Sequence, residues 1–514
     1  MKYFLTLIQL WVGFLSICAS YPKANIWIIP SVESPQVYRN YAQTSKVHLE
    51  MARGEVEHIQ LVFPSKVNEE YRFTFDRYLK GIQISARELK KMNGYYDALV
   101  PFKNQLKCTD TLTAVWITVQ CPSRVPVGKY HQTIKIEGSK HFTIQLDYNV
   151  HHTTIPLKSS IPITVGVENR CMTEGLNDKE ADKERQRWVD FVLSYRMTPV
   201  FGTQITPERW QYEHSFSPWA WNDKRSIRLL NDRRYSCYML PFFTLSENEL
   251  ASLLCNIQKK GKLKESLFYI WDEPAYMEDY EQIKRKVNII RKYASDARIL
   301  TTFFCGPRNG PRKGDLYAVF DYLKHHIHVA TISLAPCKGN EEEVQHIRYK
   351  VPEGIDWWSY VCWQPGGNEP NFLLQMKGIQ QRAIMWRTWK NGSQGFLYWN
   401  CNIYHKRNPF TYITDMPHGD GILIYPGDIL GCKGPIASAR LERWSDGAEE
   451  MELLRLVEKN YSKEKADTLL NIVYSSPLSF IEKAHNIPFF RKELLDQLDK
   501  TIPIDYKLRI TDFI

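Results

Sequence analysis

The pattern of hydrophobic and polar positions divides the chain into a β-rich first part and a longer second part. Between about residues 21 and 158, short runs of β-branched and aromatic residues alternate with clusters of Gly, Pro, Asn and Ser, a spacing typical of a β-sandwich. The predicted strands are Ala24–Pro30, Val47–Leu49, Ile59–Phe63, Ala114–Val119, Gln132–Ile136 and Phe142–Val150. Because no acidic residues converge in this region, we expect it to support a second domain.

From about residue 160 the pattern changes to strand, helix, strand. The candidate strands are Ile161–Glu168, Met197–Gly202, Ser236–Phe242, Leu267–Trp271, Arg298–Phe303, His328–Leu334, Ile355–Val361 and Gly395–Trp399. Apolar residues at helical spacing predict helices between them, for example Asp182–Tyr195 and Met277–Tyr293. Eight strands with intervening helices match a (β/α)8 barrel of the TIM type. A doubly wound sheet is the alternative, but no Gly-x-Gly-x-x-Gly follows the first strand.

After about residue 440 the pattern is helical, over Ala448–Val457, Lys463–Val473 and Lys492–Lys500. The predicted fold class is therefore α/β plus β, with a C-terminal (β/α)8 barrel preceded by an N-terminal β-sandwich. The predicted segments are a signal peptide at 1–20, the sandwich at 21–158, the catalytic barrel at 159–445 and a helical extension at 446–514.

The first 20 residues have the features of a signal peptide. Lys2 precedes a short apolar run, and small residues around Ser20 predict cleavage after it. We therefore expect an exported protein, secreted or periplasmic. The alternative is a lipoprotein box, Leu15-Ser16-Ile17-Cys18, with a lipid anchor at Cys18, although Ile17 is bulky for such a box. No later run reaches the ~18 apolar residues of a membrane-spanning helix.

The net charge and the spacing of Cys and His residues argue against two classes of function, nucleic-acid binding and metal binding. The formal net charge of +10 is spread along the chain without a Lys/Arg block, so nucleic-acid binding is not expected. The 11 cysteines are irregularly spaced, and His325, His326 and His328 precede a strand at the wrong end of a barrel. We therefore predict no metal and no cofactor. The oligomeric state cannot be predicted from the sequence.

The candidate chemistry follows the strand Leu267–Trp271, where Asp272 and Glu273 stand just before Pro274. Barrel enzymes carry their active sites at the carboxyl ends of the strands, so this pair is placed for acid/base chemistry. The structural alternative is that the two acids cap the helix predicted from Met277.

Two adjacent acids on one loop reach the same side of a sugar. They do not suit the usual retaining pair, which needs carboxyl groups ~5 Å apart across the anomeric carbon, nor the wider inverting pair. They do suit substrate assistance, in which the 2-acetamido oxygen of the sugar attacks the anomeric carbon. One acid then orients the acetamido N–H, while the other protonates the leaving oxygen and later activates water. Close like charges also raise one carboxyl pKa, as a general acid requires.

Other strand ends provide a candidate pocket. Trp358, Tyr360 and Cys362 share one face of a strand, and the Tyr360 hydroxyl is placed to donate to an acetamido oxygen. Trp399 is a candidate apolar floor for the sugar, and Asn400 or Asn402 for binding its hydroxyls. The alternative for each aromatic residue is packing inside the barrel. Asp356 begins its strand and is assigned to the stability face of the barrel.

These motifs resemble glycoside hydrolase family 123. The resemblance rests on Phe268–Pro274, Trp357–Tyr360, Arg382 ahead of Met385-Trp386, Gly395–Trp399, Gly419–Gly421 to Tyr425–Gly427, Arg440–Glu442 and Asp446–Glu450. The second half of this set is similar to the domain of unknown function 4091. The segment Trp444–Glu450 departs from the commoner Arg-Asp-Gly-Ile-Glu-Asp pattern, and we interpret it as helix packing.

The resemblance implies an exported β-N-acetylgalactosaminidase with a substrate-assisted, retaining mechanism. Glu273 would be the acid/base, Asp272 would orient the acetamido group, and Tyr360 matches a family tyrosine near that group. The predicted substrate is a glycan or glycolipid with terminal N-acetylgalactosamine, cut by an exo-acting enzyme. Two alternatives stay open: another β-hexosaminidase, specific for N-acetylglucosamine or endo-acting, and a non-catalytic glycan-binding barrel.

Overall fold

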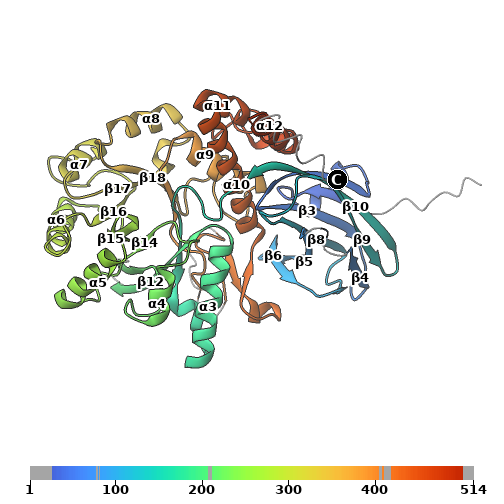
Figure 1. The fold of residues 1–514 in the computed structure, drawn as a ribbon, viewed down its shortest axis with the longest axis horizontal. Coiled ribbons are helices and arrows are strands. Elements are labelled where there is room, and N and C mark those ends of the chain that lie inside the picture. Colours follow the sequence, from blue (N-terminus) through green and yellow to red (C-terminus); the bar gives the residue numbers. More distant parts are fainter. Residues whose placement is uncertain are drawn as a thin grey trace, which may run out of the picture.

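The computed structural model describes residues 26–76, 79, 81–206, 211–404, 408–409 and 418–501 (Figure 1). The predicted signal peptide and the alternative lipid anchor at Cys18 lie outside these residues. Among the described residues, no helix has the length and apolar character needed to cross a membrane. All ten cysteines within them are free thiols.

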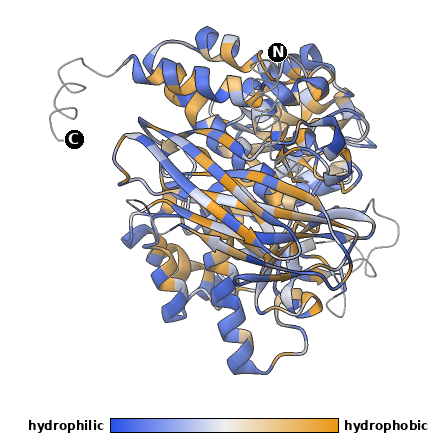
Figure 2. Ribbon diagram, turned by 90° about the vertical axis from the view of Figure 1, so that its right-hand side faces the viewer, coloured by the Kyte–Doolittle hydropathy of each residue, from blue (hydrophilic) through white to orange (hydrophobic). Residues whose placement is uncertain are grey.

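The N-terminal region consists of two five-stranded sheets that share one hydrophobic core. Its strands are β1 (Trp27–Pro30), β2 (Lys46–Arg53), β3 (Glu55–Pro64), β4 (Glu70–Phe75), β5 (Gln83–Met92), β6 (Tyr95–Pro101), β7 (Gln105–Lys107), β8 (Leu112–Cys121), β9 (Gly128–Glu137) and β10 (His141–Thr154). One sheet has the order β1-β3-β8-β5-β6 and the other β2-β10-β9-β4-β7. Figure 2 shows hydrophilic and hydrophobic residues alternating along strands of this region, as strands with one covered face require.

The six strands predicted here overlap β1, β2, β3, β8, β9 and β10. The prediction missed β4 to β7. In β5 the reason is visible: its sequence is rich in Arg, Glu and Lys, and several of its positions are exposed or half-buried. A strand with many charged positions lacks the hydrophobic alternation on which the prediction relied.

The second region is built on a nearly closed, barrel-like sheet of nine strands. Its strands are β11 (Ile163–Glu168), β12 (Thr198–Thr206), β13 (Gln211–Ser215), β14 (Tyr238–Met239), β15 (Ser266–Trp271), β16 (Arg298–Phe303), β17 (Val329–Ser333), β18 (Asp356–Val361) and β19 (Gly395–Tyr398). The order is β13-β12-β11-β19-β18-β17-β16-β15-β14. All pairs are parallel except β12 with β13.

The eight predicted strands correspond to the eight parallel strands, and β13 is the addition that the prediction missed. It forms because β12 continues to Thr206 and the chain then returns beside it. No strand pairing joins the edge strands β13 and β14 among the described residues, but hydrogen bonds connect their surroundings. The Phe216 N–H, just after β13, donates to the Met239 carbonyl of β14 at 2.6 Å, and the Ser236 N–H donates to the Thr198 hydroxyl of β12 at 3.1 Å. The sheet is therefore nearly closed, and differs in this way from a plain ring of eight strands.

Helices surround this sheet, as Figure 1 shows for α5 to α8 around β14 to β18. The α-helices are α2 (Asn169–Thr173), α3 (Asp178–Ser194), α4 (Lys224–Leu229), α5 (Glu247–Lys259), α6 (Met277–Arg291), α7 (Leu316–Leu323), α8 (Glu341–Lys350), α9 (Gly378–Lys390), α10 (Ala439–Asn460), α11 (Lys463–Leu470) and α12 (Ile487–Asp499). Short 3-10 helices are η1 (Pro35–Asn40), η3 (Leu263–Glu265), η4 (Ala335–Cys337), η5 (Gly427–Leu430) and η6 (Ile481–Asn486). A hairpin of β20 (Ile424–Pro426) and β21 (Pro435–Ala437) precedes α10.

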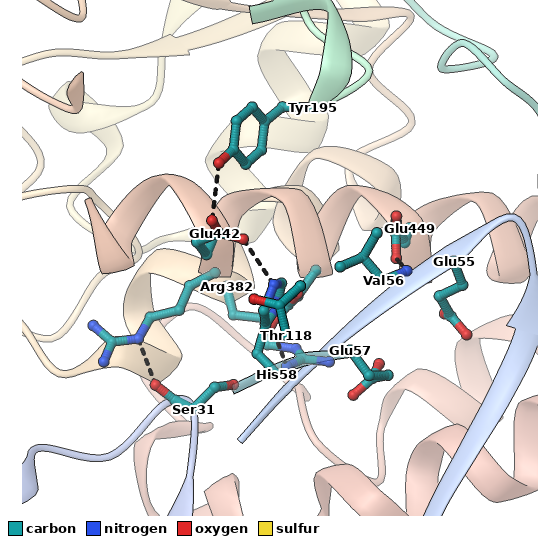
Figure 3. A network of polar contacts seen from close by, with 12 residues as sticks. Ser31, Glu55, Val56, Glu57, His58, Thr118, Tyr195, Arg382, Glu442 and Glu449 are labelled. Carbon is teal, nitrogen blue, oxygen red and sulfur yellow. Dashed lines mark hydrogen bonds and ion pairs between the residues drawn. The ribbon is translucent and has the colours of Figure 1, made fainter. Parts of the chain in front are cut away.

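Helix α10 joins the two regions and is buried along most of its length. Its acids meet cations from the N-terminal strands and from neighbouring helices, in a network that Figure 3 shows in part. His58 on β3 contacts Glu442 and Asp446 at 2.7 Å each, and Arg382 on α9 binds Asp446 at 2.9 Å and Glu450 at 2.6 Å. The segment Trp444–Glu450 therefore packs as predicted, and its buried ion pairs connect α10 with β3 and α9. The predicted domain limits stay a prediction.

Candidate active site

Asp272 and Glu273 directly follow β15, whose six residues are all buried. Helix α6 begins only four residues after Glu273, at Met277. The carboxylate of Asp279 caps this helix by accepting from the backbone N–H groups of Ala275, at 2.8 Å, and Tyr276, at 2.9 Å. The first N–H of the helix, that of Met277, donates to Asn309 Oδ1 at 2.8 Å. Asp279 and Asn309 thus satisfy these N–H groups, and the acid pair does not cap the helix.

One carboxylate oxygen of Asp272 is held by two hydroxyl groups. The Tyr269 hydroxyl donates to Oδ1 at 2.7 Å, and the Thr302 hydroxyl, at the end of β16, donates to the same oxygen at 2.8 Å. Within the described chain no hydrogen bond occupies Oδ2. Loss of hydration raises the pKa of Asp272, although the two hydroxyl groups act in the opposite direction.

Glu273 has a left-handed backbone conformation, with φ of 43°. Such a conformation costs a non-glycine residue about 1–3 kcal/mol and persists only where surrounding contacts enforce it. Here the Glu273 N–H donates to the Thr302 hydroxyl at 2.9 Å, and the Tyr360 hydroxyl donates to Glu273 Oε1. The strained turn therefore fixes the second carboxyl group beside the first.

Loss of hydration and the neighbouring charge of Asp272 raise the pKa of Glu273 to about 6, while Tyr360 and Arg308 act to lower it. Both acids are accessible to solvent, even though protein surrounds them closely enough to remove much of their hydration. A carboxyl group that is accessible to solvent but closely flanked by protein can meet a substrate and still have a raised pKa. This combination suits a general acid.

A small cavity at the carboxyl ends of the strands connects Asp272 with the aromatic residues. Its lining includes Tyr269, His214 and Trp399. The indole N–H of Trp399 donates to Asp420 Oδ1 at 3.0 Å. Asp420 is buried, and loss of hydration raises its pKa to about 6. The Trp399 ring is therefore held at the cavity by a carboxyl group that follows β19 in a separate loop.

The other predicted site residues lie in different surroundings. Trp358 is buried inside the barrel in one cluster with Tyr360 and Cys362, as their shared face predicted. Asn402 is fully buried, and its side chain binds the backbone N–H of Glu168 at 2.8 Å and the Glu168 carbonyl at 3.2 Å. Their predicted contacts with substrate stay predictions. The structure brings together Asp272, Glu273, Tyr360 and Trp399, and places Trp358 and Asn402 in the supporting interior.

Asp356 and the histidines that were not expected to bind a metal, His325, His326 and His328, lie at the amino ends of the strands, away from the acid pair. Asp356 begins β18 and pairs with Arg298, the first residue of β16. His328 stands just before β17, where its Nδ1 accepts from the Ile299 N–H at 3.2 Å. Among the described residues, no cluster of three or more His, Cys, Asp or Glu is arranged to hold a metal ion.

Sequence reasoning missed Tyr269, Thr302, His214 and Asp420 as parts of this site. Thr302 had a usable signal, because it is a polar residue at the carboxyl end of a neighbouring strand. His214 had none, since β13 itself was not predicted. Asp420 lies between two glycines, but nothing in the sequence connects it with Trp399.

A roomier cavity lies between β1 to β3 and α12, and it is lined mainly by apolar side chains. The charged groups beside it are engaged with each other: Arg491 contacts Glu57 at 2.8 Å. It contains no acid pair at a strand end, so the chemistry is assigned to the cavity beside Asp272.

Comparisons with known proteins identify the family of the chain. The model of the glycoside hydrolase 123 catalytic domain matches residues 183–457, just over half of the chain. A family 123 glycoside hydrolase from Clostridium perfringens, studied for glycolipid glycan hydrolysis, matches with a TM-score of 0.62 at 13% identity, covering 95% of this chain and 100% of that one. This likeness establishes the fold.

More distant matches include a GH5 xyloglucanase from Bacteroides ovatus, with a TM-score of 0.24 at 9% identity, covering 79% of this chain and 98% of that one. A GH2 β-galacturonidase from Eisenbergiella tayi has a TM-score of 0.35 at 8% identity, with 77% and 90% covered. These two scores are too low to bear on fold or function. No curated protein matches the sequence significantly. On the evidence of the matched catalytic domain and the acid pair within it, the chain belongs to glycoside hydrolase family 123 and is a glycoside hydrolase.

Proposed function

We propose that the protein is an exported, exo-acting β-N-acetylgalactosaminidase that removes terminal N-acetylgalactosamine from glycans or glycolipids with retention of configuration. The observation that carries the proposal is the adjacent pair Asp272 and Glu273. Asp272 has one oxygen that accepts no hydrogen bond from the described residues, and Glu273 has a pKa of about 6. The fold assigned with it is a (β/α)8 barrel, with β13 as an insertion, behind an N-terminal β-sandwich.

In the first step the acetamido oxygen of the sugar attacks the anomeric carbon. The bond to the leaving oxygen breaks, and Glu273 gives that oxygen its proton. Asp272 accepts a hydrogen bond from the acetamido N–H through Oδ2, since Oδ1 is already held by Tyr269 and Thr302. This contact strengthens as the nitrogen gains positive charge, so it stabilises the transition state more than the ground state.

In the second step water attacks the anomeric carbon of the cyclic intermediate from the side that the leaving group vacated. Glu273 is now ionised and takes the proton of this water, which regenerates the acetamido group and the protonated acid. Two inversions give net retention. Trp399, held by Asp420 at 3.0 Å, offers an apolar wall to the sugar.

The test compares aryl β-N-acetylgalactosaminide with its N-acetylglucosamine epimer and with aryl β-galactoside, with and without a thiazoline mimic of the cyclic intermediate. We expect turnover of the galacto-configured acetamido sugar, inhibition by the thiazoline, and no turnover of the galactoside, which lacks the internal nucleophile. Cleavage of the galactoside would contradict substrate assistance. Preference for the gluco epimer would show that the enzyme is specific for N-acetylglucosamine instead of N-acetylgalactosamine. Cleavage of internal bonds alone would indicate an endo-acting enzyme.

The Clostridium perfringens enzyme, to which the chain is similar in fold, hydrolyses glycolipid glycans. We propose the same substrate class here. Glycan binding by the wild-type protein without any product would instead favour a non-catalytic glycan-binding barrel.

A further inference from the structure

Strand β13 brings two aromatic side chains into the cavity that contains Asp272. Side chains alternate along a strand, and Tyr212 and His214 both line the cavity. Between them, Glu213 is buried and its carboxylate accepts from the Phe242 N–H at 2.8 Å and the Thr244 N–H at 2.7 Å. The strand is thus anchored through Glu213, and its alternate residues face the cavity.

His214 is directly linked to the acid pair through Tyr269. The imidazole stacks on the Tyr269 ring with centroids 4.3 Å apart and an interplanar angle of 13°. The hydroxyl at the far end of that ring donates to Asp272 at 2.7 Å. His214 and Asp272 therefore contact the same tyrosine, one at its ring face and the other at its hydroxyl, and both line one cavity.

The position opposite His214 on the neighbouring strand is a glycine. The register pairs His214 with Gly202 on β12, and Gly202 also lines the cavity. A Cβ atom at Gly202 would lie 3.5 Å from the Tyr212 ring, an ordinary contact, so its absence is not forced by packing. Position 202 therefore adds no side chain to the cavity wall opposite the imidazole.

The imidazole has unused hydrogen-bonding capacity. Within the part of the chain that the structure describes, His214 makes ring contacts with Tyr212 and Tyr269 and no hydrogen bond. Loss of hydration lowers its pKa to about 3, so the ring is neutral in the usual pH range. A neutral imidazole offers one N–H donor and one nitrogen acceptor, which matches a hydroxyl group that can also donate and accept.

We propose that His214 is a sugar-recognition residue, whose imidazole hydrogen-bonds a ring hydroxyl of the N-acetylhexosamine that Asp272 holds by its acetamido group. This inference rests on the proposed function for the identity of the sugar. It assigns to β13, the one antiparallel strand of the sheet, the task of reading the hydroxyl pattern.

The test combines His214→Phe, which keeps a ring to stack on Tyr269 and removes both nitrogens, with aryl β-N-acetylgalactosaminides that lack the 3-, 4- or 6-hydroxyl. We expect the wild type to lose about tenfold in kcat/KM on the analogue without the contacted hydroxyl, the effect of one neutral hydrogen bond. H214F should lose about tenfold on the parent substrate and nothing further on that analogue. Additive losses on all three analogues, or a parent kcat/KM within twofold of wild type, would overturn the proposal.

Two further variants separate recognition from folding. His214→Gln keeps a donor and an acceptor, and we expect it to recover part of the loss, which a purely structural role would not predict. His131→Phe alters an exposed imidazole on β9 that pairs with Asp147, and should leave kcat/KM unchanged. Thermal melting of each variant reports whether it is folded.

Sugar binding distinguishes failure of this inference from failure of the proposed function. N-acetylgalactosamine is titrated into wild type and H214F, with tryptophan fluorescence as the readout. If the wild type binds the sugar but cleaves nothing, weaker binding by H214F still supports the role of His214, and equal binding overturns it. If the wild type does not bind N-acetylgalactosamine, both proposals are overturned.

Discussion

The acids of the active site and the acids of α10 both lose hydration, but they differ in what surrounds them. Asp272 meets hydroxyl groups, and its pKa is raised. Glu442 on α10 contacts Arg87 and His58, and these cations outweigh its burial and hold its pKa well below the ordinary value. The pKa of Asp446 is likewise lowered, by the charges of His58 and Arg382.

The difference shows how one residue type serves two purposes. A carboxyl group that is desolvated without a cation keeps its proton to higher pH and becomes a useful acid. A carboxylate whose cations outweigh its lost hydration, as at Glu442 and Asp446, stays charged and links helices and strands that lie far apart in sequence. Some acids of the α10 network fall between these two cases, because burial outweighs their cations. Burial raises the pKa of Glu57 to about 8 and that of Glu449 to about 7.

The largest expected effect is on activity, from Glu273→Gln. The amide cannot donate the proton that the leaving oxygen needs, so we expect kcat/KM to fall by about 10²–10⁴-fold on a substrate with a poor leaving group, with little change in the free energy of unfolding. Glu265→Gln is the matched control, because Glu265 precedes β15 and, among the described residues, forms an ion pair with Lys262 alone. Retained full activity in E273Q would remove Glu273 from the mechanism.

The next effect is on stability, from Arg382→Met. This change leaves Asp446 and Glu450 buried without their shared cation, so we expect the free energy of unfolding to fall by about 3–5 kcal/mol. Denaturant titration measures it. Lys377→Met removes an exposed pair with Glu482 and should cost less than ~1 kcal/mol. If folded R382M lost as much kcat/KM as E273Q, the acids of α10 could not be assigned to stability alone.

The smallest expected effect is on the pH profile. Glu273 must be protonated to act as an acid, and its folded-state pKa of about 6 predicts that kcat/KM falls above about pH 6. The Tyr360 hydrogen bond acts to lower this pKa, so in Tyr360→Phe the falling limb should move to higher pH. Tyr95→Phe, at an exposed tyrosine, should leave the limb in place. A limb that moves to lower pH in Y360F would contradict the assignment.

Much of the barrel could be predicted because its strands are buried on both faces. The run before Asp272 is continuously apolar, as parallel strands under helices require, and it ends at two acids. Strand β5 and strand β13 could not be predicted, since charged or aromatic residues replace the alternation of apolar and polar positions. In α10 the packing of Trp444–Glu450 could be predicted, but the ion pairs of its acids could not, because their cations come from β3, β5, α9 and α12.

The sequence by itself determined the strand pattern, the position of Asp272 and Glu273 at a strand end and the resemblance to the family. These are local properties, read within a few residues or from a motif. Only the tertiary structure decided that Thr302 and Tyr360 hold the acid pair, that Asp420 holds Trp399, and that His214 faces the same cavity as Asp272. Hydrogen bonds and lost hydration depend on groups that fold together from distant segments, so no local pattern could reveal them.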